Sequence, residues 1–187
     1  MVQAPVELLT LEAFLEMPET KPASEFINGR VIQKPMPKPK HSVIQGELVT
    51  AINGVLKSKR IGYAFPELRC TFGSRSIVPD ISVLKWERLP IDENGDLSDD
   101  FEGHPDWAIE ILSPQQSYNL VLDKILHALN HGTEMGWLID PTHRTILICP
   151  AGAQPQNIEE MGDRLPTPSF AESVSLTRGD LFSYLKM

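Results

Sequence analysis

The chain has 187 residues, of which 41% are hydrophobic and 22% charged, a composition typical of one soluble domain with its own core. Two cysteines are too few for a disulfide framework, the acidic N-terminus does not resemble a signal peptide, and no apolar run approaches the roughly 20 residues of a membrane span. We therefore expect one cytoplasmic domain over residues 1–187.

The net charge of −8 is unevenly distributed along the chain. Residues 21–75 hold ten basic against three acidic residues, whereas residues 76–187 hold seven basic against eighteen acidic ones. A basic region of this kind can bind a polyanion despite the negative total, or it can be an unevenly charged solvated surface. The sequence leaves both readings open.

A short helix is expected near the start of the chain. Thr10 can cap it, and Leu11, Phe14 and Leu15 form its apolar face. Pro18 ends it, because proline lacks the backbone N–H that a helix interior needs.

A hairpin and an extended linker follow this helix. Residues 25–32 predict a β-hairpin, because Asn28-Gly29 suits a type I′ turn between two apolar runs. From Lys34 to Lys40 basic residues alternate with prolines, which favours an extended linker. This linker could contact phosphates or be only a solvated loop.

The middle of the chain predicts one longer helix and then strands. Ser42 is expected to cap a helix from Val43 to about Lys59, which Gly62 closes. Apolar residues recur along it at helical spacing. The strands expected next are Tyr63–Phe65, Leu68–Phe72 and Ile77–Leu84.

In the second half, an acidic connection precedes a strand–helix–strand pattern. Residues 88–106 carry seven carboxylates and indicate a flexible connection. The elements expected after it are strands at 107–112, 135–140, 145–149 and 174–176, with helices at 117–131 and 177–184 and a loop at 150–169. The order predicts an α/β fold with a mixed β-sheet flanked by helices on both faces.

Two acidic residues lie inside apolar segments of this sheet, Asp80 in Ile77–Leu84 and Glu110 in Trp107–Leu112. A buried carboxylate is costly unless a cation pairs it. Alternate residues of a strand share a face, so the two carboxylates can converge if their strands are neighbours. One of them would then be forced to protonate unless a cation lies between them.

Oxygen ligands of this kind suit Mg²⁺ or Mn²⁺, which can polarise a phosphate. Lys124 lies fourteen residues after Glu110, on the next expected helix, and its ammonium could stabilise a pentacovalent phosphate. Simpler roles are also open: Asp80 could accept backbone N–H groups, and Glu110 could form a structural ion pair with Lys124. On the residues alone these structural roles are favoured.

A family resemblance changes that balance. Val78-Pro79-Asp80 followed by Glu110 resembles the PD-(D/E)XK nuclease superfamily. Over nearly its full length the chain resembles the Uma2 (DUF820) family of restriction-endonuclease-like proteins within it. The matching segments are Leu9–Leu15, Glu25–Gly29, Pro79-Asp80, Ile109–Pro114, Lys124, Gly132 and Gly136–Pro141, of which the last blocks are the specific ones.

The resemblance implies a restriction-endonuclease-like fold and a Mg²⁺-dependent phosphodiesterase site. Asp80 and Glu110 would be its metal ligands, and Lys124 the third catalytic residue. In the superfamily the lysine usually stands two residues after the second acid, a place held here by Leu112. Lys124 therefore corresponds to a lysine that has moved to the following helix.

Four other positions bear on the site. Family members often have an acid near position 120 and an aromatic residue four positions after the lysine, where this chain has Leu120 and Ala128. His41 lies where the family often has histidine, and it could contact the site or have a capping or surface role. Glu67 could supply a further acid, but its flanking pattern is weak.

The function predicted from these residues is that of a metal-dependent endonuclease hydrolysing DNA phosphodiester bonds. Asp80, Glu110 and Lys124 are its predicted catalytic residues, Mg²⁺ or Mn²⁺ its cofactor and DNA its substrate. A homodimer is expected, since such nucleases cut two strands. The alternative is a catalytically inactive protein of the same fold that acts as an oligomeric interaction or nucleic-acid-binding module.

Overall fold

The computed structural model describes residues 9–186, so the first eight residues and Met187 of the expected 1–187 domain lie outside it. Within these residues no helix is long and apolar enough to cross a membrane. The elements, in chain order, are α1 (Leu11–Leu15), β1 (Ser24–Ile27), β2 (Arg30–Gln33), α2 (Pro39–Leu56), β3 (Gly62–Pro66), β4 (Cys70–Phe72), β5 (Arg75–Ile77), β6 (Ile81–Lys85), η1 (Trp86–Arg88), β7 (Trp107–Ile111), α3 (Tyr118–Leu129), β8 (Met135–Asp140), β9 (Thr145–Pro150), β10 (Gln156–Asn157), η2 (Ser169–Ala171) and α4 (Arg178–Ser183).

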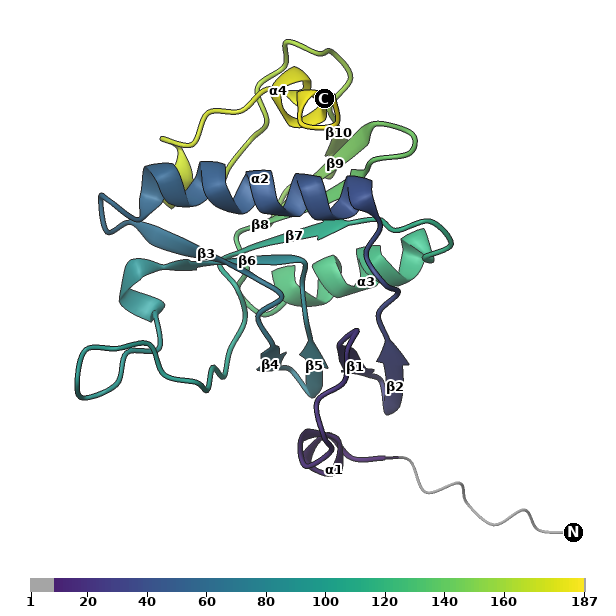
Figure 1. Ribbon diagram of the computed structural model, residues 1–187, viewed down its shortest axis with the longest axis vertical. Coiled ribbons are helices and arrows are strands. Elements are labelled where there is room, and N and C mark those ends of the chain that lie inside the picture. Colours follow the sequence, from purple (N-terminus) through teal and green to yellow (C-terminus); the bar gives the residue numbers. More distant parts are fainter. Residues whose placement is uncertain (1–8, 187) are drawn as a thin grey trace, which may run out of the picture.

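The strands form two sheets (Figure 1). The larger sheet has the order β10-β9-β8-β7-β6-β3, in which β7 and β8 are parallel and every other neighbouring pair is antiparallel. Helix α3 makes the crossover that a parallel pair requires. The smaller sheet has the order β2-β1-β5-β4 and is antiparallel. The expected mixed sheet is therefore confirmed.

Helices cover both faces of the larger sheet, as expected. On one face, α2 buries a stripe that packs with Ile109 and Ile111 of β7 and with α4. On the other face, Val121 and Ile125 of α3 pack against Leu138 of β8. The approach of α3 is close at Gly136, where a Cβ atom would lie 2.3 Å from a methyl carbon of Ile125. The stripe of α2 consists of Ile44, Leu48, Ile52 and Leu56, all fully buried.

Several local predictions are confirmed. Thr10 and Thr177 each cap a helix through the side-chain oxygen, as expected, and Ser117 caps α3 in the same way. Asn28 and Gly29 both have positive φ, 52° and 75°, as a type I′ turn requires. These signals are local, so they do not depend on how the chain packs elsewhere.

The bounds predicted for the long helix are wrong at both ends. Helix α2 begins at Pro39 with Lys38 as N-cap, not at Val43 after Ser42. Proline suits the first helical turn, where its missing N–H is not needed. The helix ends at Leu56, and the left-handed residue that follows is Arg60, with φ of 52°, rather than Gly62.

The strand expected over Ile77–Leu84 is in fact two strands in different sheets. β5 ends at Ile77 in the smaller sheet and β6 begins at Ile81 in the larger one. Pro79 lies between them and cannot donate a ladder hydrogen bond. Asp80 therefore precedes a strand rather than lying in its middle.

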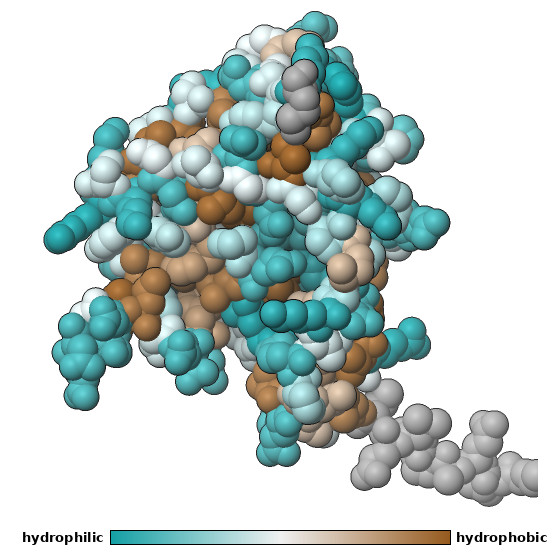
Figure 2. Space-filling model, in the orientation of Figure 1, coloured by the Kyte–Doolittle hydropathy of each residue, from teal (hydrophilic) through white to brown (hydrophobic). Residues whose placement is uncertain are grey.

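The remaining segments differ less from expectation. Residues 174–176 are not a strand, because the chain there makes only single contacts such as the hydrogen bond from Leu165 N–H to Leu176 O. The acidic connection after η1 stays outside both sheets apart from isolated bridges. In Figure 2 this loop, at the lower left of Figure 1, is largely hydrophilic, while apolar side chains gather beside α1.

Candidate active site

Asp80 lies where the chain passes into β6, directly opposite Glu110 of β7. Strands β6 and β7 are antiparallel, with Ile81 paired to Ile109, so the next position outward pairs residue 80 with residue 110. The backbone N–H of Ile111 donates to Asp80 Oδ2 at 2.7 Å. The two strands are thus neighbours, which is the condition under which the carboxylates were expected to converge.

Two basic side chains hold the Asp80 carboxylate, which is only 2% exposed. Lys34 Nζ lies 2.7 Å from Oδ1 and also donates to the carbonyl of Val78 at 2.8 Å. His41 Nε2 lies 3.1 Å from Oδ2. Burial alone would raise the pKa of Asp80, but Lys34 and His41 outweigh it and hold this pKa well below its ordinary range.

Glu110 has the opposite electrostatic balance. Burial raises the pKa of its carboxyl to about 7, with Lys124 opposing the shift and Asp80 adding to it. Lys124 Nζ lies 2.9 Å from Glu110 Oε1. Among the described residues this buried oxygen makes no hydrogen bond of good geometry, and the Lys124 ammonium is its ion-pair partner. Glu110 is therefore stabilised by fewer contacts than Asp80, which faces both Lys34 and His41.

Lys124 joins Glu110 to a second acid, Glu25 of β1. Its ammonium lies 3.0 Å from Glu25 Oε1, which also accepts the backbone N–H of Val78 at 2.8 Å. Burial would lower the pKa of Lys124, but Glu110 and Glu25 outweigh it and raise the pKa above its ordinary value. The side chain, 1% exposed, therefore remains protonated at neutral pH.

The three residues singled out from the sequence, Asp80, Glu110 and Lys124, thus meet in one buried cluster. His41 joins them through Asp80. Glu67 does not: its backbone N–H donates to the Asp80 carbonyl at 3.1 Å, but its side chain is exposed and lines a different pocket.

Sequence reasoning missed two members, Glu25 and Lys34. Glu25 is one acid in an otherwise apolar strand, the same signal that singled out Glu110, but it lies in a hairpin that gives no sign of its partner. Lys34 is the first lysine after β2 and is buried, while Lys38 and Lys40 of the same segment are exposed. Nothing in the sequence distinguishes it from those two.

The positions at which the chain departs from the superfamily (Leu112) or from family members (Leu120 and Ala128) are accommodated by apolar packing. Leu112, where the superfamily usually has lysine, is buried against α3. Leu120 packs on the apolar cluster of the smaller sheet, and Ala128 is fully buried. Leu112 therefore leaves Lys124 as the ammonium that reaches Glu110.

The donor set fits a hard divalent cation. Within residues 9–186 no three histidine, cysteine or acidic side chains are grouped to hold a metal by themselves. Asp80 and Glu110 nevertheless supply two carboxylates, and Glu110 Oε1 is a buried oxygen without a hydrogen bond. Mg²⁺ commonly binds through one or two carboxylates and completes its shell with water and substrate oxygens. The two carboxylates would therefore suffice.

Comparison with known proteins places this site in a family. Residues 11–179 match the model of Uma2, described as "Putative restriction endonuclease". The chain belongs to the Uma2 family. A crystal structure described as a "putative nuclease belonging to DUF820", from Anabaena variabilis ATCC 29413, is 53% identical, with a TM-score of 0.93. The match covers 95% of this chain and 99% of that one, whereas no curated protein matches. The Uma2 resemblance and the restriction-endonuclease-like fold are thereby confirmed.

Proposed function

We propose that this Uma2 protein is an endonuclease that hydrolyses DNA phosphodiester bonds with Mg²⁺ or Mn²⁺. The observation that carries the proposal is the meeting of Asp80, Glu110 and Lys124 in one buried cluster. Buried ion pairs seldom stabilise a fold more than apolar contacts would. Catalysis gives these charges a role that stability does not.

Asp80 and Glu110 would hold the metal ion. When bound, the ion would polarise the scissile phosphate and make a water molecule easier to deprotonate. Lys34 and His41 keep Asp80 ionised, because they hold its pKa low. The N–H of Ile111 fixes the orientation of the same carboxylate. Asp80 is therefore a preorganised oxygen ligand at neutral pH.

Lys124 would act as a fixed positive charge. Its raised pKa keeps the ammonium protonated at neutral pH, so it cannot take a proton as a general base. It can stabilise the negative charge that develops on the phosphorus oxygens during attack. Glu25 also pairs with the ammonium, at 3.0 Å, which limits its movement.

Cleavage of supercoiled plasmid tests the proposal, with Mg²⁺, Mn²⁺ or EDTA present. Asp80→Ala, Glu110→Ala and Lys124→Ala are each expected to slow cleavage by at least about 100-fold. Asp100→Ala and Glu102→Ala are the matched controls, because they remove the same side chains from the exposed acidic loop. Circular dichroism verifies that each variant is folded. Cleavage that survives Asp80→Ala and Glu110→Ala would contradict the site assignment.

One observation favours the alternative, a nuclease-fold protein without activity. Asp80 and Glu110 each already face a lysine ammonium, at 2.7 and 2.9 Å, so the cluster is nearly neutral without a metal. Calorimetric titration with Mg²⁺ and Mn²⁺ separates the two functions. Heat of binding that disappears in an Asp80→Asn, Glu110→Gln variant supports the nuclease, and absence of heat in the wild type supports the inactive binding module.

The proposal extends to assembly and compartment. A homodimer would place two such sites on the two strands of a duplex, and sedimentation analysis would measure its mass. A reduced, cytoplasmic setting agrees with Cys70 and Cys149, which are both free and buried. Fractionation of the source cells would test the compartment.

A further inference from the structure

A row of neighbouring hollows borders the charged cluster. Three hollows of about 250, 530 and 370 Å³ follow one another around the connection from β7 to α3. The first is lined by Lys34 and Lys124 and shares Gln115 and Gln116 with the second. The second shares Leu112, Pro114 and Thr142 with the third, which ends at the N-cap Lys38 and at Lys40 and His41 of α2. We name these three hollows the site groove.

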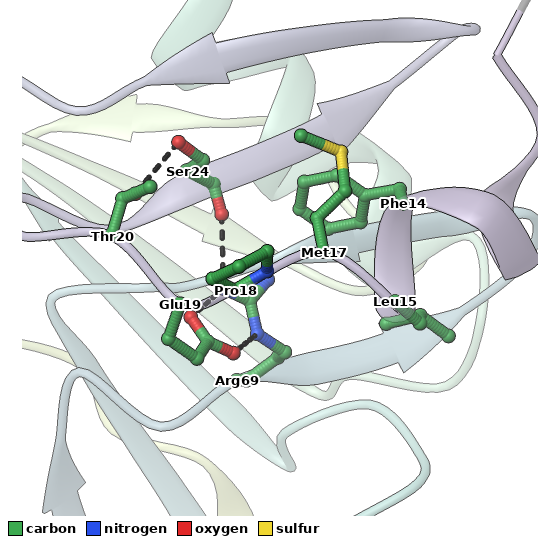
Figure 3. A pocket seen from close by; sticks show the side chains of 8 residues that line it. All are labelled: Phe14, Leu15, Met17, Pro18, Glu19, Thr20, Ser24 and Arg69. Carbon is green, nitrogen blue, oxygen red and sulfur yellow. Dashed lines mark hydrogen bonds and ion pairs between the residues drawn. The ribbon is translucent and has the colours of Figure 1, made fainter.

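The charge of the site groove suits a polyanion. Its lining includes four lysines and two histidines, against the acids Glu25 and Asp140. Lys34, Lys124 and both histidines are paired with acids, so the exposed Lys38 and Lys40 supply the positive charge that a phosphate would meet. The other large hollow, about 740 Å³ between β3, β4 and the acidic loop, has five acids and only Arg69 as a base. Figure 3 shows the small pocket beside this acidic hollow, where Arg69 donates two hydrogen bonds to the Glu19 carboxylate. The one base of the hollow is therefore already paired. The acidic hollow would therefore repel a nucleic acid.

His143 is held at the side of the site groove. Its Nδ1 lies 2.7 Å from Asp140 Oδ2, while Asp140 Oδ1 accepts the backbone N–H groups of Thr142 and His143. The ring is 76% exposed, so Nε2 can reach a bound ligand. The two backbone hydrogen bonds hold the Asp140 carboxylate in place, and this carboxylate in turn orients the His143 ring.

The remaining wall is largely apolar. Tyr118, on the first turn of α3, lines the groove and is 42% exposed. Pro39, Pro114 and Pro141 line the part that ends at α2. A duplex exposes its phosphates but buries the faces of its bases, so its bases could not stack on this apolar wall. An unpaired strand presents both, and its bases stack on aromatic rings whatever their sequence.

We propose that the site groove binds an unpaired DNA strand next to the scissile phosphate, with Tyr118 stacking on a base and Lys38, Lys40 and His143 contacting phosphates. The inference rests on the proposed function and narrows its substrate to DNA that is single-stranded at the point of cleavage. It assigns a role to residues outside the charged cluster.

Binding without cleavage tests the inference. A fluorescein-labelled oligothymidine of about 15 nucleotides and a duplex of equal length are titrated in EDTA, and fluorescence anisotropy gives Kd. The wild type is expected to bind the single strand at least about tenfold more tightly than the duplex. Tyr118→Ala is expected to weaken single-strand binding by roughly 5- to 100-fold, and Tyr118→Phe to preserve it.

The lysines are tested by salt dependence. Lys38→Ala combined with Lys40→Ala is expected to lower the slope of log affinity against log salt by about 1.4, since each phosphate contact on a single strand contributes about 0.7. Lys57→Ala combined with Lys59→Ala is the matched control, because it removes the same charge beyond the other end of α2. The Kd of His143→Ala for the single strand is compared with that of His131→Ala, because His131 lies outside the groove.

The outcomes separate this inference from the proposed function. Single-strand binding that depends on Tyr118, without cleavage of either the plasmid or a single-stranded oligonucleotide in Mg²⁺ or Mn²⁺, leaves the inference standing and removes the nuclease. Cleavage by a protein whose Tyr118 and lysine variants bind like the wild type overturns the inference alone. Equal or tighter binding of the duplex, or no binding of the single strand by the wild type, also overturns it.

Discussion

The two faces of strand β7 differ sharply in chemistry. Ile109 and Ile111 belong to the large apolar cluster on the α2 face. Glu110, between them, points to the opposite face, where the apolar cluster is smaller and gives way to buried acids and lysines. One strand of five residues therefore serves the core on one side and a charged cluster on the other.

The difference shows that stability and chemistry are separated by the alternation of the strand. Apolar burial contributes about 25 cal/mol per Å² and has no directional requirement. The charged face needs each partner at a set distance and adds little net stability, because desolvation offsets the attraction. Substitutions on the apolar face should therefore change mainly the stability of the fold, and those on the charged face mainly its pH dependence and chemistry.

The largest effect is expected on the apolar face. Ile109→Ala should lower the free energy of unfolding by about 2–5 kcal/mol, because it removes a fully buried side chain and leaves a cavity. Urea denaturation measures this loss. The folded fraction should keep the metal binding proposed for Asp80 and Glu110. A loss of metal binding in folded Ile109→Ala protein would show that the two faces are not independent.

A smaller, pH-dependent effect is expected on the charged face. The folded-state pKa of Glu110, about 7, lies above its ordinary value of 4.5, so the native state holds the proton more tightly. The free energy of unfolding should therefore fall as pH rises from about 4.5 to 7, and this contribution is lost above the folded pKa. Glu110→Gln should remove up to about 3 kcal/mol of that pH dependence in EDTA.

Denaturation curves at pH 5 and pH 8 measure this difference. Titrating histidines remain the same in both proteins, so they cancel in the comparison. Parallel pH profiles for wild type and Glu110→Gln would mean that burial does not raise the pKa of Glu110.

The smallest effect comes from two matched helix caps. Thr177→Ala removes the cap of α4 on the apolar face, and Ser117→Ala that of α3, the helix that carries Lys124. Each should cost about 1 kcal/mol of stability. Only Ser117→Ala should also slow plasmid cleavage, by severalfold. Equal cleavage by both variants would contradict a role for α3 in placing the ammonium.

Much of the fold could be predicted because its signals are local. Caps at Thr10 and Thr177 and the turn at Asn28-Gly29 depend on a few neighbouring residues. The errors arose where a local signal had a competitor. Ser42 is a good cap, but Pro39 starts the helix one turn earlier. The apolar run through Asp80 reads as one strand, but the chain passes at Pro79 from β5 of the smaller sheet to β6 of the larger one.

The site could be predicted only in part. Asp80 and Glu110 stand out because each interrupts an apolar run, and the family resemblance pointed to Lys124. Glu25 and Lys34 could not be found in this way, because their partners lie far along the chain. Their pairing depends on how the smaller sheet packs beside the larger one. The spacing of apolar residues along the chain predicts helices and strands but not this packing.

Those long separations set the order in which the cluster can form. Lys34 meets Asp80 across 46 residues, and Lys124 meets Glu25 across 99. A chain still emerging from the ribosome, complete only through β7, has its acids but lacks the ammonium of α3. The complete cluster appears late, after loop closures that are slow to make. Synthesis itself thus delays the moment at which the cluster is complete.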